Sequence, residues 1–516
     1  MNISEMVSQN AVKYPRESAL IELKPSEGCR HEINWQTFNE RVDRFAAALS
    51  ARGVKKGDRV LHLRFNSINW LEAYFGIIRT GAWVVPLNYR FTGEDIAYCA
   101  EIAEAKVMVL GDEFAKRVIS VRDKLKMISS FIYVGGDTPK SMENFEQVIS
   151  NAPLGRPEVT ISEDDPCGLY FTSGTTGAPK PILLTHKNME AAAITEQNHH
   201  RQTHEDNFIL LPPLYHTGAM MHWLGNLLVG AKATLLMEIN PKVIFEAISE
   251  EKGTIVWLLV PWAQDILGAL DRGELNIENY QLSQWRLMHI GAQPVPASLV
   301  RHWKTYFPEM LFDNNYGLSE ATGPGCVHLG TENEQREGAI GRPGFNWEAR
   351  IVNAEGNTAK AGEVGELAVR GGGVMKEYYK NPEKTAESLC DGWLFTGDMA
   401  KTDEDGFIYL VDRKKDLVIT GGENIFPVEI EEFLYSHPKV YDAAVIGIPD
   451  ERLGEITAAV IDPQPGQTLT EAEIAAFCEK HLPRYKRPRK IIFDKVPRNP
   501  TGKIEKPKLR EKYHTK

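Results

Sequence analysis

Residues 173–180 bring together groups that can hold a phosphate chain. The run Ser-Gly-Thr-Thr-Gly-Ala-Pro-Lys contains three hydroxyls, two glycines and one lysine within eight positions. Glycine lets backbone N–H groups approach an anion closely, while the hydroxyls and the ammonium of Lys180 add donors and positive charge. The apolar segments 168–172 and 182–185 flank the run and predict a strand on either side of it. The sequence therefore predicts a triphosphate-binding loop between two strands.

Two other interpretations of this loop are weaker. A polar hairpin turn explains most short Gly/Ser/Thr loops, but it does not explain a Pro-Lys pair that opens an apolar strand. A P-loop requires a lysine that is followed by Ser or Thr and leads into a helix. Here Lys180 lies between Pro179 and Pro181 and leads into a predicted strand. Spacing and context therefore both argue against a P-loop.

A second polar segment, residues 314–320, could complete a nucleotide site. It reads Asn-Asn-Tyr-Gly-Leu-Ser-Glu and so combines amides, an aromatic ring, a hydroxyl and a carboxylate. A purine needs a stacking face and an amide partner, and a magnesium triphosphate needs a hard oxygen ligand. Taken alone, Glu320 would more often be a surface or capping residue. Together with the loop at 173–180, the segment indicates an ATP site.

The segment 170–180 resembles the signature loop of the adenylate-forming superfamily of acyl-CoA synthetases, peptide-synthetase adenylation domains and luciferases. The resemblance covers essentially the whole chain and is greatest in pattern to fatty-acid and aryl-acid CoA ligases. It implies that ATP and a carboxylic acid form an acyl adenylate and pyrophosphate, and that CoA then takes the acyl group and releases AMP. The chain departs from the family pattern at Pro181, where glycine is usual, and at Ser319, where threonine is commoner.

This resemblance assigns the nucleotide site residue by residue. Tyr316 is implied to pack on adenine, Asp398 to accept both ribose hydroxyls and Arg413 to reach ribose or phosphate. A carboxylate suits a diol because it offers two acceptors. The implied ATP- and AMP-binding residues are Thr172, Ser173, Gly174, Thr175, Thr176, Gly177, Lys180, Gly291, Ala292, Gln293, Asn315, Tyr316, Gly317, Leu318, Ser319, Asp398, Arg413 and Lys503.

The catalytic groups follow from the same resemblance. Lys503, in a turn at residues 497–504, is implied to place its ammonium between the α-phosphate and the substrate carboxylate. Glu320 and Thr176 are implied to hold Mg²⁺, and His216 to lie near the carboxylate. Carboxylate attack on phosphorus brings two anions together, so a positioned cation and Mg²⁺ lower the barrier.

The transfer step is expected to use the C-terminal part of the chain. Gly421, Gly422 and Glu423 resemble the loop that lines the pantetheine channel of CoA after the C-terminal domain rotates, and Lys415 falls at the family's hinge position. From residue 484 to the end there are 13 Lys and Arg against three acidic residues. This basic tail is either a solvated surface or a site for the phosphates of CoA.

The acid is expected to be apolar. The segment 211–218 resembles the family segment that flanks the acyl site, and it lacks the aspartate that amino-acid-activating domains generally place there. Bulky side chains suggest a pocket of restricted depth for a short- to medium-chain, branched, alicyclic or aromatic monocarboxylate, although taken alone each tryptophan would more often belong to the core. The expected acyl-binding residues are His216, Thr217, Met221, Trp223 and Gly291.

Elements of two kinds must position these residues. Apolar residues in 35–49 recur at helical spacing, with Gly53 placed to end the helix, and β-rich runs at 59–63, 83–87 and 106–110 alternate with helical stretches such as 70–80. This rhythm predicts an α/β class: a large N-terminal region of α/β layers at 1–411, with a small β-rich subdomain between 363 and 410. A charged cluster at 412–416 predicts a hinge, and 417–516 a smaller, mobile α+β domain that carries Lys503.

Bulk properties restrict the remaining possibilities. The net charge of −11 argues against a nucleic-acid binder, because neutralising phosphates needs a concentrated positive surface. Six cysteines without a C-x-x-C pair suggest neither a zinc site nor a disulfide framework, and fit a reducing compartment. The longest apolar run, 255–262, is far shorter than a membrane span. We expect a cytoplasmic enzyme, and an oligomer is possible. Its alternative role is to load a separate carrier protein. A scaffold protein that has lost catalysis is disfavoured by the presence of Lys503, Glu320 and Asp398.

Overall fold

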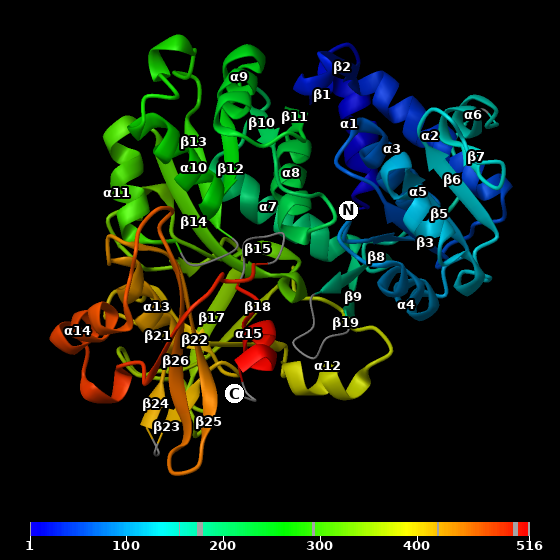
Figure 1. Cartoon of the computed structure of the whole chain (residues 1–516). Helices are drawn as coiled ribbons and strands as arrows, with labels where there is room; N and C mark the ends of the chain where they lie inside the picture. Colours follow the sequence, from blue (N-terminus) through cyan, green and yellow to red (C-terminus); the bar gives the residue numbers. More distant parts are fainter. Residues whose placement is uncertain are drawn as a thin grey trace.

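The computed structural model describes residues 2–153, 155–172, 179–291, 295–420, 423–498 and 504–513, without the side chains of residues 324, 423 and 424. Two large sheets lie side by side in the upper part of the view, and the C-terminal elements, orange to red, lie below the green strands (Figure 1). The α/β class predicted from the sequence is confirmed.

An eight-stranded sheet forms the first layer of the N-terminal region, in the order β19-β9-β8-β4-β3-β5-β6-β7. Its central strands β3 to β6 and β8 pair in parallel, and β9 turns back antiparallel on β8, so that Thr172 faces Lys180 across the ladder. The phosphate-loop sequence therefore joins two paired strands. The strands are β3 (Arg59–Leu63), β4 (Trp83–Pro86), β5 (Val107–Gly111), β6 (Ser130–Val134), β7 (Glu143–Asn144), β8 (Pro166–Thr172), β9 (Lys180–Thr185) and β19 (Glu377–Tyr378).

A nine-stranded sheet forms the second layer, in the order β16-β15-β14-β13-β12-β10-β11-β1-β2. Strands β12, β13 and β14 run in parallel, so the segments that end them, near Gly291 and Leu318, meet at one edge, where open α/β sheets bind their ligands. The strands are β1 (Ser18–Lys24), β2 (Cys29–Asn34), β10 (Asn207–Leu210), β11 (Lys232–Leu236), β12 (Ile255–Leu259), β13 (Leu287–Gly291), β14 (Leu311–Leu318), β15 (Gly323–His328) and β16 (Arg342–Pro343).

Helices cover these sheets, and local signals in the sequence explain their ends. In α2 the Asn34 side chain accepts a hydrogen bond from the Thr37 N–H, and Gly53, with φ +82°, follows the last turn. Its buried face includes Phe38, Val42 and Phe45, as the spacing predicts. The helices are α1 (Ser4–Lys13), α2 (Trp35–Ala51), α3 (Ile68–Arg79), α4 (Gly93–Ala103), α5 (Ala115–Ile119), α6 (Phe145–Ser150), α7 (His186–His200), α8 (Thr217–Leu228), α9 (Pro241–Glu251), α10 (Val260–Asp271), α11 (Ala297–Tyr306) and α12 (Pro382–Ser388).

A small antiparallel sheet completes the N-terminal region. It pairs β17 with β18, β18 with β21, and β21 with both β20 and β22. The sheet begins earlier than the β-rich subdomain that was predicted to start at residue 363. That prediction followed the Gly-rich turns, and the first strand of the sheet precedes those turns. The strands are β17 (Trp347–Val352), β18 (Gly365–Gly371), β20 (Leu389–Cys390), β21 (Trp393–Thr402) and β22 (Ile408–Arg413).

The C-terminal part has its own sheet and its own core. Val418, Ile430, Val445 and Ile461 belong to a buried cluster that is separate from the N-terminal clusters. An independent core of this kind is the mark of a domain. Its elements are β23 (Val418–Thr420), β24 (Glu423–Ile425), α13 (Pro427–Tyr435), β25 (Val440–Asp450), β26 (Gly454–Pro463), α14 (Glu471–His481), β27 (Lys490–Phe493) and α15 (Lys506–Tyr513).

No described helix is both long enough and apolar enough to cross a bilayer. All six cysteines are free, and Cys29 and Cys390 are exposed.

Candidate active site

A cavity of about 2700 Å³ lies between the N-terminal region and the C-terminal domain. Many of the residues singled out in the sequence line it together. They are Thr172, His216, Thr217, Asn315, Tyr316, Gly317, Leu318, Ser319, Glu320, Asp398, Arg413 and Lys415. The structure thus brings segments from both large sheets and from the small sheet to one place.

Asp398 is held in the wall of this cavity from two sides. The Tyr316 hydroxyl donates to Asp398 Oδ2 at 2.5 Å, and Arg413 Nε lies 3.1 Å from Asp398 Oδ1. Asp398 and Arg413 are direct neighbours across the β21–β22 ladder, whereas Tyr316 comes from β14. The Asp398 carboxylate raises the pKa of Arg413, and burial raises the pKa of Tyr316. An ionised acceptor in a fixed orientation is what a ribose diol requires.

Glu320 is oriented by a tyrosine from another sheet. It lies in the short helical turn Ser319–Ala321 after β14, and its Oε1 accepts a hydrogen bond from the Tyr378 hydroxyl at 2.8 Å. Burial and the neighbouring carboxylate raise the pKa of Tyr378, so this phenol remains a donor. Beside it, the Thr217 hydroxyl donates to Ser319 Oγ at 3.2 Å and ties the start of α8 to the end of β14.

The phosphate loop is described only at its two ends. Thr172 Oγ1 donates to the carbonyl of Lys180 at 3.4 Å, and Thr172 lines the cavity. Lys180 does not appear among the residues of the cavity wall. Several predicted site residues lie outside the described residues, namely Ser173, Gly174, Thr175, Thr176, Gly177, Ala292, Gln293, Gly421, Gly422 and Lys503. Glu423 is described in its backbone alone, in β24.

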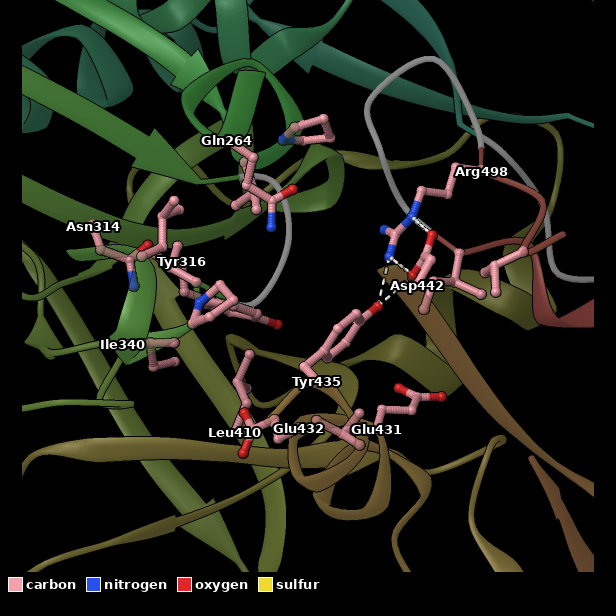
Figure 2. Close-up of a pocket in the computed structure, with 18 of the residues that line it drawn as sticks. Gln264, Asn314, Tyr316, Ile340, Leu410, Glu431, Glu432, Tyr435, Asp442 and Arg498 are labelled. Atoms are coloured by element: carbon pink, nitrogen blue, oxygen red, sulfur yellow. Dashed lines mark hydrogen bonds and ion pairs between the residues drawn. The ribbon is translucent and has the colours of Figure 1, made fainter. Parts of the chain in front are cut away.

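The C-terminal domain forms the opposite wall. Figure 2 shows Tyr435, Asp442 and Arg498 across the cavity from Tyr316. Arg498 donates to both Asp442 oxygens at 2.7 Å and to the Tyr435 hydroxyl at 2.9 Å. Arg498 and Ile504 form an antiparallel bridge, and both line the cavity. The C-terminal domain therefore presents the residues on both sides of 499–503 to the nucleotide side of the site.

The predicted acyl-binding residues divide into two groups. His216 and Thr217, at the N-terminus of α8, line the cavity. Met221 and Trp223 are fully buried, and the Trp223 ring packs 5.7 Å from that of Phe75. These two side chains fill the core and do not line the cavity, because they lie further along α8 on its buried face. Gly291 ends β13 and is buried outside the cavity lining.

Trp257 closes the space behind the start of α8. A Cβ on Gly218 would lie 2.9 Å from the Trp257 ring, so only glycine lets the helix approach that ring so closely. Trp257 in turn stacks on His222, with ring centroids 4.5 Å apart. Packed rings therefore limit the depth behind His216 and Thr217.

The link between the two domains is a buried polar junction. Asp412, at the end of β22, accepts hydrogen bonds from the Val428 N–H at 3.0 Å and the Arg413 N–H at 2.6 Å. Burial raises the pKa of Asp412 to about 6. Asp416, in the turn after β22, pairs with Arg510 of α15 at 2.6 Å. The predicted hinge position, Lys415, is exposed in this turn and lines the cavity.

Sequence reasoning missed the residues that support the site. Tyr378 holds Glu320 from 58 positions away, and Asp442 holds Arg498 from 56 positions away. No local pattern marks either partner, since each is an isolated polar residue in an ordinary strand. Only the pairing of strands from different parts of the chain reveals them.

A fixed carboxylate for a diol, an oriented glutamate and a second domain over the cavity define a two-domain nucleotide-binding enzyme. A family model of AMP-binding enzymes matches residues 7–379, and a model of the AMP-binding enzyme C-terminal domain matches residues 429–503. The chain belongs to the family of AMP-binding enzymes.

Several relatives are similar over nearly their whole length. A long-chain-fatty-acid–CoA ligase of Mycobacterium tuberculosis is 30% identical, with 99% of this chain and 98% of that protein covered. A feruloyl-CoA synthase of an Amycolatopsis species is 33% identical, with 93% and 94% covered. Among solved structures, an anthranilate CoA ligase in complex with anthranoyl-AMP is 28% identical, with a TM-score of 0.90 and 99% and 97% of the two chains covered. The resemblance to the adenylate-forming superfamily is thus confirmed.

Proposed function

We propose that this chain activates a short- to medium-chain, alicyclic or aromatic monocarboxylic acid with ATP and transfers the acyl group to CoA. The chain is an AMP-forming acid–thiol ligase that uses ATP, Mg²⁺ and CoA, in keeping with its family and with relatives that are CoA ligases for fatty and aryl acids. These relatives do not favour the alternative in which a carrier protein takes the acyl group.

One observation carries the proposal: Asp398 is fixed between Tyr316 and Arg413 on a cavity that the C-terminal domain covers. In the proposed complex Asp398 accepts the two ribose hydroxyls, Tyr316 packs on adenine, and Arg413 reaches ribose or phosphate. The segments at 172–180 and 291–293, with Asn315 and residues 317–319, complete the nucleotide site.

The α-phosphorus is attacked by the substrate carboxylate, and pyrophosphate leaves. The carboxylate is proposed to lie at the N-terminus of α8, near His216 and Thr217, where the helix dipole favours an anion. Lys503 is proposed to bring its ammonium to both anions, since the flanking residues Arg498 and Ile504 line the same cavity. Its positive charge lowers the barrier because negative charge accumulates as the two anions approach.

The residues present fit a magnesium ion. The Glu320 carboxylate is a hard oxygen ligand, and its hydrogen bond from Tyr378 holds it in one orientation. Thr176 is the second proposed ligand, by its place in the phosphate loop. Mg²⁺ bound there would neutralise charge on the triphosphate.

The depth of the acyl site supports a compact acid. Trp257 stands directly behind Gly218, so a long chain could not extend past the start of α8 without displacing buried rings. Trp257 therefore takes the role in limiting pocket depth that was predicted for Met221 and Trp223. Those two residues lie in the core.

Transfer to CoA is proposed to follow rotation of the C-terminal domain, residues 417–516, about a hinge at 412–416 on the N-terminal domain 1–411. Gly421, Gly422 and Glu423 would then line the channel for the thiol. Free and exposed Cys29 and Cys390 support the proposed location in the cytoplasm, where thiols stay reduced.

Pyrophosphate release tests the function. The purified protein is incubated with ATP, Mg²⁺ and a series of acids of increasing length, including aryl and alicyclic acids, with and without CoA. We expect pyrophosphate to form with compact acids, and turnover and acyl thioester to require CoA. Absence of ATP consumption with every acid would overturn the proposal, and a preference for long chains would overturn the substrate class.

A further inference from the structure

Six ionisable side chains form a buried cluster behind the active site, and the proposed reaction uses none of them. All are at most 3% exposed, and they come from five elements that are distant in sequence. The members of this histidine cluster are Glu196 and His200 of α7, His222 of α8, His289 of β13, Asp313 of β14 and His328 of β15.

His328 joins the two acids of the cluster. Its Nε2 lies 3.0 Å from Glu196 Oε1, and its Nδ1 lies 3.1 Å from Asp313 Oδ2. A ring that meets a carboxylate at both nitrogens is doubly protonated, because carboxylates only accept. One imidazolium between two carboxylates leaves this group with a net charge of −1.

The other contacts fix the tautomers of His200 and His222. His200 Nε2 donates to Asp313 Oδ2 at 2.8 Å, and His222 Nδ1 donates to the carbonyl of Gly218 at 2.8 Å. In its neutral form each ring carries its lone pair on the other nitrogen, His200 Nδ1 and His222 Nε2. In metal sites, ligating histidines donate their second N–H to a carboxylate or carbonyl in this way.

These lone pairs converge on another acceptor. Glu196 Oε2 lies 3.1 Å from His222 Nε2 and 3.6 Å from His200 Nδ1. The Asn315 amide nitrogen reaches these acceptors through long contacts, 3.3 and 3.4 Å to the two Glu196 oxygens and 3.5 Å to His222 Nε2. Acceptors that face one another in a dry interior repel unless a proton or a cation lies between them.

His289 supplies a third nitrogen. Among the described residues neither of its ring nitrogens has a hydrogen-bond partner within 3.5 Å, although Nδ1 lies 3.7 Å from Asp313 Oδ2, and His200 Nδ1 likewise has none. One nitrogen from each of His200, His222 and His289 lies within 4.8 Å of the others. In a tetrahedral zinc site with bonds of about 2.1 Å, ligand atoms are about 3.4 Å apart, so modest side-chain rotation would complete the site.

We propose that His200, His222 and His289 bind one divalent transition-metal ion of the Zn²⁺ class, with the Glu196 carboxylate as the neighbouring negative charge. Three imidazoles are a known ligand set for Zn²⁺ and leave one position of the tetrahedral shell for a further oxygen ligand. The metal links α7, α8 and β13 directly behind Asn315, and it neutralises the excess negative charge of the cluster. Its role is to hold the rear wall of the active site.

The metal content of the unmodified full-length protein tests this proposal. Because every ligand is buried, the ion must be present during folding, so the protein is expressed in zinc-supplemented medium and also refolded with zinc chloride. Mass spectrometry of the elements should find about one zinc per chain after extensive dialysis, and protein produced with cobalt should show the visible bands of tetrahedral Co²⁺. Folded protein that holds less than about a tenth of an equivalent by both routes would overturn the proposal.

The His289→Leu variant tests whether His289 binds a metal ion or only packs in the core. Without a metal the nearest polar partner of this histidine is Asp313 Oδ2, 3.7 Å from Nδ1, so leucine should change the melting temperature little. If the metal is present, the variant should lose it and melt at a lower temperature. His62→Leu is the matched control, because His62 is also fully buried with no hydrogen-bond partner at either nitrogen, but it stacks on Trp70 outside the cluster.

The control should keep its zinc. A His289→Leu protein with full zinc content, or equal loss of zinc in both variants, would contradict the assignment. If a variant does not fold, the wild-type metal content still decides. The measurement needs no substrate, so an inactive protein that contains zinc would count against the proposed function alone.

Discussion

At the scale of single residues, Asp398 depends on partners from two sheets. Arg413 faces it across the β21–β22 ladder, and Tyr316 reaches it from β14, 82 positions earlier. The two contacts fix both oxygens of one carboxylate. A group held in this way can meet a ribose without reorganisation, which strengthens binding.

Asp398→Asn should therefore lower kcat/KM for ATP about 100-fold, since hydrogen bonds to a charged group contribute about 1.5–3 kcal/mol each. Tyr316→Phe keeps the ring and loses only the bond to Asp398, so we expect a loss of about tenfold. Pyrophosphate release at varied ATP measures both. Asp391→Asn is the control, because Asp391 is exposed and its φ of 50° suits asparagine. Unchanged kinetics in Asp398→Asn would contradict the ribose assignment.

The proposed catalytic lysine allows a test of the two half-reactions. Lys503→Ala should lower adenylate formation by about 10²- to 10³-fold, because it removes a cation from the transition state, and should largely spare the transfer of a supplied acyl adenylate to CoA. Lys508→Ala is a matched control on α15, where Lys508 is exposed and pairs with Glu505 at 2.6 Å. Equal losses in both half-reactions would count against the role of Lys503.

At the scale of elements, the turn after β22 joins the small sheet to the C-terminal domain. The Asp416 and Leu417 N–H groups both donate to the carbonyl of Arg413, at 2.8 and 3.2 Å, which defines a compact turn. Lys415 lies in its middle, exposed on the cavity wall. A few residues at the end of an element are sufficient for a domain hinge.

Proline at position 415 should restrict this turn, because it limits φ of residue 415 and the conformation of residue 414. We expect Lys415→Pro to retain adenylate formation in single-turnover assays and to reduce overall acyl-CoA synthesis about tenfold or more. Lys415→Ala, which removes the charge and keeps the backbone free, should remain close to wild type. Wild-type turnover in the proline variant would argue against a hinge here.

At the scale of the whole molecule, the buried Asp412 couples the stability of the domain junction to pH. Its carboxylate accepts backbone N–H groups from both sides of the junction and lies near Lys506. Burial nevertheless raises its pKa from 3.8 to about 6. The folded state therefore binds a proton more tightly than the unfolded state, and this contribution to stability is present below pH 4 and is lost as the pH rises through about 6.

Asp412→Asn should remove this pH dependence, because the amide does not ionise. The contribution is at most about 3 kcal/mol, so relative to wild type the variant should melt higher at pH 7 than at pH 4.5. Calorimetric melting temperatures at the two pH values measure the effect. Glu404→Gln, an exposed substitution in the same subdomain, should show no such difference. If the variant lost more stability relative to wild type at pH 7 than at pH 4.5, the sign assigned to the pH dependence of the Asp412 contribution would be wrong.

The sequence alone determined the α/β class, the positions of several elements and the motifs proposed for the site. Helix α2 (Trp35–Ala51) covers the helical spacing predicted at 35–49, and β3 runs over Arg59–Leu63 as predicted, because hydrophobic periodicity and caps act within a few residues. The motif around Tyr316 and Glu320 was readable for the same reason: its groups are contiguous in the chain.

The tertiary structure alone decided which distant side chains meet. Met221 and Trp223 are core residues, Tyr378 orients Glu320, and Glu196 meets His328 across 132 positions. No local pattern encodes such pairs, because they depend on the order in which parallel strands assemble and on which faces the helices bury. The sequence thus shows the chemical groups of each local motif, whereas contacts between distant segments form only when the two sheets and the C-terminal domain pack together.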